Sequence, residues 1–69
     1  MKLFELLEVF DGNTAITINC DDENPYYEQS AKEITKDSDF KTIKNRQVLS
    51  FGVELSETDD ESPVLYIDL

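Results

Sequence analysis

Cys20 is the chain's single cysteine and the side chain best suited to nucleophilic chemistry. A thiol attacks as its thiolate, which forms when a neighbouring positive charge or a basic histidine lowers its pKa. The sequence contains no histidine, and three acids follow the cysteine directly: Asp21, Asp22 and Glu23. Negative neighbours raise the pKa of a thiol. We therefore expect Cys20 to be a small buried hydrophobe.

Other catalytic and metal-binding arrangements are excluded by composition. Without histidine, Ser–His and Cys–His pairs are impossible, and a single cysteine leaves a structural zinc site without enough ligands. The two glycines, Gly12 and Gly52, lie too far apart for a phosphate-binding loop. The sequence therefore predicts a protein that is not an enzyme, with no catalytic residue, no metal and no cofactor.

Two acidic runs, residues 21–24 and 57–61, offer the oxygen ligands that calcium prefers. Neither follows the spacing that places such ligands around one ion. Solvated acidic loops are the better interpretation of both runs.

Charge is unevenly distributed along the 69 residues, whose formal net charge is −10. Five of the six basic residues fall within residues 32–46, and the segments on either side are strongly acidic. An overall negative charge repels nucleic acid and anionic lipid, so neither is an expected partner. We expect the basic residues to lie against the acidic segments and reduce their repulsion.

The first third of the chain changes from a helical to a strand pattern. Residues 2–10 have apolar side chains at helical spacing, and Gly12 is expected to end that helix in a left-handed conformation. Residues 14–20 alternate and predict a half-buried strand. Residues 26–34 fit either a strand or a helix that follows Asn24-Pro25, and we prefer the strand because a polar turn commonly leads into a hairpin partner.

The last third predicts a hairpin. Residues 35–46 form a connection with a short helical turn that begins at Ser38 or Asp39. Residues 48–55 and 64–69 alternate as strands, joined by an acidic loop over residues 56–63. The residues expected to point inward are Leu49, Phe51, Val53, Leu55, Leu65, Ile67 and Leu69.

These elements predict one domain over residues 1–69 of the α+β class, with the order α-β-β-(short α)-β-β. The N-terminal helix is expected to cover one face of a mainly antiparallel sheet. A chain of this length buries little apolar surface, so association with a second copy or a partner is a physical means of adding more.

Four segments resemble small uncharacterised proteins encoded by phages, plasmids and conjugative elements of Firmicutes. These segments are the opening residues 1–7, the Asp11-Gly12-Asn13 turn, residues 31–34 and residues 46–50. The resemblance implies an accessory protein of a mobile element and carries no site residue with it.

Because no catalytic or metal-binding site is expected, we expect the protein to act through contacts that its surface makes with other molecules. Tyr26 and Tyr66 fall on the outward phase of their strands, and tyrosine is common at interfaces. The candidate interaction surface comprises Tyr26, Tyr66, Asp59, Asp60 and Glu61. We expect a cytoplasmic protein-interaction module with a protein partner, which includes the formation of a homodimer. The alternatives are a DNA mimic that inhibits a nucleic-acid-handling enzyme, as in anti-restriction or anti-CRISPR proteins, and a structural or self-associating subunit.

Overall fold

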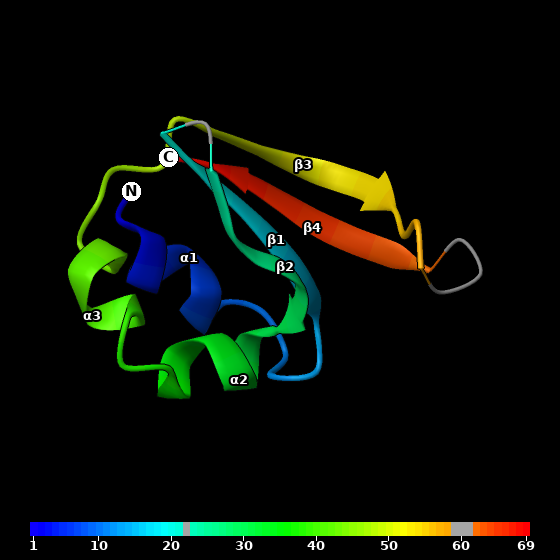
Figure 1. Ribbon diagram of the computed structural model, residues 1–69, viewed down its shortest axis with the longest axis horizontal. Coiled ribbons are helices and arrows are strands. Elements are labelled where there is room, and N and C mark those ends of the chain that lie inside the picture. The colour runs from blue at the N-terminus through cyan, green and yellow to red at the C-terminus, as the bar shows by residue number, and fades with distance from the viewer. Residues whose placement is uncertain (22, 59–61) are drawn as a thin grey trace.

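The computed structural model describes residues 1–21, 23–58 and 62–69, and within them four strands form one mixed sheet with three short helices on one face (Figure 1). This architecture confirms the predicted small α+β domain with a mainly antiparallel sheet. In chain order the elements are α1 (Leu3–Glu8), β1 (Ala15–Cys20), β2 (Glu23–Ser30), α2 (Ala31–Lys36), α3 (Phe40–Ile43), β3 (Ser50–Leu55) and β4 (Pro63–Asp68).

The sheet has the strand order β2-β1-β4-β3. β1 pairs antiparallel with β2 and β4 pairs antiparallel with β3, whereas the two central strands β1 and β4 run parallel. The predicted hairpin of the last two strands is confirmed by the β3–β4 ladder. The local patterns of the sequence do not predict the parallel pairing of the two central strands.

The core lies between the helices and the central strands. α1 places Leu3, Leu6 and Leu7 against the sheet, where Ile18 and Ile67 are fully buried. The backbone N–H of Lys2 donates to the Glu5 carboxylate at 2.9 Å and satisfies one of the free donors at the start of this helix. Apolar spacing therefore predicted the buried face of α1 correctly, although the helix is shorter than residues 2–10.

Gly12 does not have the left-handed conformation that was expected of it, because no glycine in the described residues has a positive φ. Val9 ends α1 with an ordinary right-handed conformation. Gly12 instead allows a close approach of α2: its carbonyl accepts from the Lys32 N–H at 2.9 Å, and a Cβ on it would lie 3.4 Å from the Lys32 Cβ.

The expectation of a strand through residues 26–34 is wrong beyond Ser30. β2 ends there, and α2 follows at once with Ala31 and Ile34 on its buried face. The Ser30 hydroxyl accepts from the Glu33 N–H at 3.2 Å, so it is the N-cap of the helix. The predicted short helical turn after Ser38 or Asp39 corresponds to α3.

Membrane crossing by a helix requires more length and apolar character than any helix in the described part of the chain has.

Candidate functional site

The outer edge strand β3 carries the largest group of exposed apolar side chains on the described surface. Leu49 precedes the strand with 71% of its surface exposed, and within it Phe51 is 55%, Val53 70% and Leu55 64% exposed. The expectation that these four side chains point into the core is therefore wrong. Apolar surface gathered in this way marks interaction sites more often than scattered exposed residues do.

These side chains are exposed because the helices are too short to cover β3. Phe51 pairs with Ile67 and Val53 pairs with Leu65 across the β3–β4 ladder, so each pair shares one face of the sheet. Ile67 and Leu65 are buried beneath the helical layer. The three helices are only four to six residues long, and the β3–β4 hairpin extends past them (Figure 1). Alternation thus predicted the shared face, but nothing in the described chain covers it at β3.

The two edges of the sheet differ in how they are protected. β2 contains Pro25, has two irregularities in its pairing with β1, and holds Glu28 at a φ of 51°. Proline and bulges are the devices that prevent an edge strand from pairing with another chain. β3 pairs residue for residue with β4 over its whole length, contains no proline, and carries a single charge, at Glu54. Its free edge is therefore an open template for another strand.

A hydrogen-bond network fastens the hairpin end to β2. The Glu28 carboxylate accepts from the Ser56 hydroxyl, from the Glu57 N–H at 3.1 Å and from the Thr58 hydroxyl at 2.8 Å. These bonds, above all the one from Ser56, hold the pKa of Glu28 below its ordinary value. The Tyr27 hydroxyl donates to the Glu57 carboxylate at 2.8 Å, which raises the pKa of Tyr27 to about 12. The position of β3 is therefore fixed at its C-terminal end.

Cys20 is buried, as its place in the first strand predicted, and burial raises the pKa of its thiol. The Arg46 guanidinium contacts the sulfur and forms two hydrogen bonds to the Asp21 carboxylate, at 2.8 and 3.2 Å. This ion pair lowers the pKa of Asp21 and raises that of Arg46. The expected contact between the basic segment and an acidic segment is thus confirmed for Arg46. Burial and the raised pKa both disfavour the reactive thiolate of Cys20.

The structure separates the residues predicted to form the interaction surface. Tyr26 pairs with Ile18 and is 2% exposed in the core, so its expected outward orientation is wrong. Tyr66 pairs with Thr17 on the opposite face of the sheet and is half-buried. The two tyrosines therefore do not form one patch. Asp59, Asp60 and Glu61 lie outside the described residues.

The shift of Tyr26 follows from the irregular pairing of β2. The register with β1 changes on both sides of the Ile18–Tyr26 pair, which reverses the phase of the strand and leaves Tyr27 exposed. The buried Tyr26 hydroxyl lies near the Asp37 carboxylate but forms no hydrogen bond of normal geometry among the described residues. Burial, together with the nearby negative charge of Asp37, raises the pKa of Tyr26 to about 12.

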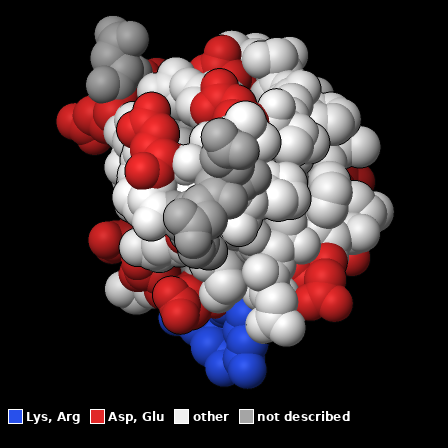
Figure 2. Space-filling model, turned by 90° about the vertical axis from the view of Figure 1, so that its right-hand side faces the viewer, with Lys and Arg blue, Asp and Glu red and all other residues white. Residues whose placement is uncertain are grey.

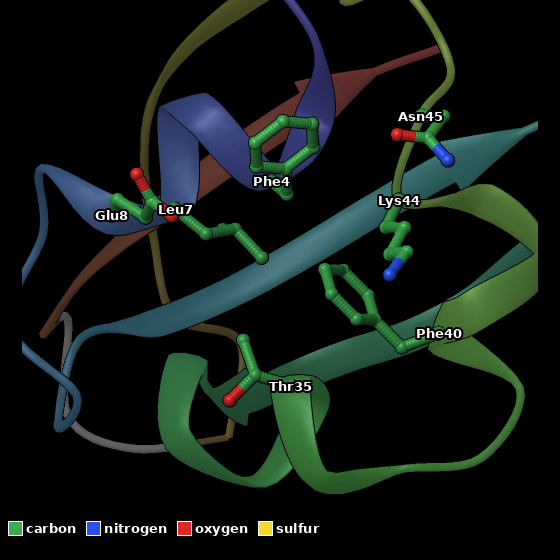
Figure 3. Close-up of a pocket in the computed structure, with 7 residues that line it drawn as sticks. All are labelled: Phe4, Leu7, Glu8, Thr35, Phe40, Lys44 and Asn45. Carbon is green, nitrogen blue, oxygen red and sulfur yellow. The ribbon is translucent and has the colours of Figure 1, made fainter.

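A cavity of about 480 Å³ opens between α1 and the α2–α3 segment (Figure 3). Phe4, Leu7 and Phe40 contribute its apolar walls, and the Lys44 amine points toward the Phe40 ring. Thr35 and Asn45 add neutral polar groups. Glu8 and Lys44 are its charged lining residues, and among the residues that the structure describes no hydrogen bond or ion pair joins two lining side chains.

Figure 2 views the molecule from the end at which the β3–β4 hairpin projects. Carboxylates are spread over this face with uncharged surface between them, and cationic side chains gather only at its lower border. Among the described residues, no group of three acidic or thiol side chains is placed to hold a metal ion.

Comparison of the chain with protein-family models, with curated proteins and with solved structures gave no match. The candidate site therefore rests on the geometry of β3 alone. A signal for it is present in the sequence: residues 49–55 alternate between apolar and polar around Gly52 and contain one charge and no proline. That pattern is typical of an unprotected edge strand as well as of a buried one.

Proposed function

We propose that this protein is a non-enzymatic protein-interaction module that binds through the free edge of β3. The single observation that supports this proposal is the exposure of Phe51, Val53 and Leu55 along one regular edge strand and of Leu49 just before it. Binding of this kind adds a strand to the sheet: backbone hydrogen bonds provide affinity, and alternate side chains provide specificity.

The distribution of charge favours apolar contact over imitation of DNA. Mimicry of phosphates uses a continuous anionic stripe, whereas the described carboxylates on the face shown in Figure 2 form several separate groups. If binding occurs through β3, the acidic residues have a separate role, which is to keep the protein soluble. A protein with an exposed apolar edge needs such charge.

The test compares two valines with nearly equal exposure. Val53 lies in β3 and is 70% exposed, and Val9 lies at the end of α1 and is 72% exposed. Val53→Lys is expected to abolish binding of partners, and Val9→Lys is expected to retain it. Capture from a lysate of the native host identifies partners, and binding is then measured with each purified pair.

The outcomes separate clearly. A partner that binds the wild type and Val9→Lys but loses at least tenfold affinity for Val53→Lys supports the proposal. Equal binding by all three proteins would show that the β3 edge is not the contact surface.

A further inference from the structure

We infer that the occupant of the β3 edge is a second copy of this chain, paired antiparallel about a twofold axis at Gly52. This inference deepens the proposed function and rests on it. The resulting dimer has one continuous eight-stranded sheet with the order β2-β1-β4-β3-β3-β4-β1-β2. Both helical layers then lie on the same face, because a twofold axis perpendicular to a sheet preserves its faces.

The sequence of the strand is self-complementary about Gly52. An antiparallel pair centred there places Leu49 opposite Leu55, and Phe51 opposite Val53, twice each across the axis. Centring the pair on Val53 would place Leu49 opposite the acidic Glu57, and centring it on Phe51 would place Leu55 opposite the polar Gln47. The register about Gly52 is therefore the one that pairs all four apolar residues with one another.

The same register keeps the Glu54 carboxylates of the two copies apart. Glu54 lies opposite Ser50 in this pairing, so the two Glu54 side chains are offset by four residues, or about 13 Å along the strands. That separation exceeds the Debye length of about 8 Å at physiological salt. Centring the pair on Glu54 would set the like charges directly opposite, which destabilises a sheet.

The steric requirement at the axis is met. Gly52 has no side chain, and a Cβ built on it would meet no atom within 4 Å, so that face of the sheet is uncovered at the centre of the strand. The ladder with β4 is regular on both sides of this position, from Ser50 to Leu55. A regular centre without a bulge is what a twofold strand pair needs.

The exposed surface is sufficient for a weak dimer. At the stated exposures the four apolar residues present roughly 450 Å² per copy; in-plane pairing covers the flanks of these side chains and leaves their outer ends in water, so two copies bury less than about 1,000 Å², the size of a weak interface. We therefore expect dissociation in the micromolar range. Each copy has a formal charge of −10, so the two copies repel one another and added salt should tighten the dimer.

Sedimentation of the full chain from about 1 µM to about 500 µM tests the inference. The mass is expected to rise from 7.9 kDa toward twice that value, and the dissociation constant is expected to fall when salt is raised from about 0.05 M to about 0.5 M. Val53→Lys should weaken the dimer at least tenfold, and Val9→Lys should leave it unchanged. A wild type that stays monomeric throughout, or a dimer that Val53→Lys does not weaken, would overturn the inference.

Two complementary variants test the register. Phe51→Lys and Val53→Glu should each dimerise at least tenfold more weakly than the wild type. An equimolar mixture should recover a heterodimer, because pairing about Gly52 places the lysine introduced at position 51 opposite the glutamate introduced at position 53. A mixture no tighter than either variant alone would overturn the pairing about Gly52. Circular dichroism checks that each variant is folded.

The same measurements distinguish failure of the dimer from failure of the proposed binding surface at β3. If the wild type is monomeric but Val53→Lys alone loses a purified heterologous partner, the second copy is the wrong occupant and the β3 edge is still the binding surface. If neither self-association nor partner binding depends on Val53, both fail.

Discussion

Val53 lies directly opposite Leu65 in the β3–β4 ladder, yet Val53 is 70% exposed and Leu65 is 4% exposed. The two residues share one face of the sheet, and one strand's width separates the buried core from open surface. The stability of the domain should therefore depend on β4 and hardly at all on the side chains of β3.

A pair of alanine substitutions checks this contrast. Leu65→Ala removes buried methyl groups and should lower the free energy of unfolding by about 2–5 kcal/mol. Val53→Ala should change it by less than about 1 kcal/mol, because most of that side chain is already in water. Urea denaturation at low protein concentration, where self-association does not contribute, measures both. Similar losses for the two variants would contradict the exposure of β3.

The two adjacent tyrosines of β2 should respond in opposite ways to loss of the hydroxyl. Tyr26→Phe removes a buried hydroxyl that forms no hydrogen bond of normal geometry among the described residues, so the free energy of unfolding should be unchanged or rise by up to about 1 kcal/mol. Tyr27→Phe removes the hydrogen bond to Glu57 and should lower it. Urea denaturation at neutral pH compares the two, and a clear loss for Tyr26→Phe would show that its hydroxyl is satisfied.

The same tyrosines predict a loss of stability at alkaline pH. The fold raises the pKa of Tyr26 and Tyr27 from 10.0 to about 12, so it favours the neutral phenols. Their contribution is fully present below pH 10 and is lost as the pH rises from 10 to about 12. Denaturation at several pH values across this window should show the decline. The double variant with phenylalanine at both positions, as the control, should show a shallower decline.

Glu28 combines backbone strain with a stabilising carboxylate. Glu28→Ala and Glu28→Gly both remove the bonds to Ser56, Glu57 and Thr58, but glycine accepts a φ of 51° without steric cost. Glu28→Gly should therefore melt about 4–8 °C above Glu28→Ala. Hydrogen exchange at the Glu57 amide, which donates to the Glu28 carboxylate, should accelerate in both variants. Equal melting temperatures would mean that position 28 is unstrained.

Cys20 should react slowly for a free thiol. It is buried and its pKa is raised, so modification at pH 8 requires a local opening of the strand end. We expect labelling by iodoacetamide at least tenfold slower in the folded protein than in urea. A native rate equal to the unfolded rate would contradict the burial of this side chain.

Much of the fold could be predicted from the sequence because local patterns determine local structure. The apolar spacing of Leu3, Leu6 and Leu7 predicted α1, and the alternation of Ile16 and Ile18 predicted β1. The start of α2 was also available, since Ser30 followed three residues later by Glu33 is a capping pattern. The preference for a strand over residues 26–34 rested on the polar turn before them and did not use this pattern.

The candidate site could not be predicted because its properties depend on distant elements. Alternation reveals which side chains share a face but not whether a helix reaches them, so Phe51 and Val53 were placed in the core. A bulge at Glu28 reverses the face of the sheet that Tyr26 occupies. The sequence has no glycine there to mark the unusual backbone conformation. The parallel pairing of β1 and β4 likewise depends on the path of the whole chain.

If two copies pair through β3, the irregular edge strand β2 limits how far the assembly can grow. Pro25 and the bulge leave that side unable to accept a further strand, so joining two copies through β3 consumes the last free border on each. A molecule with two receptive borders would extend into a fibre, whereas one with a single receptive border stops at a closed pair. Association through this single edge therefore gives a closed pair and not a polymer.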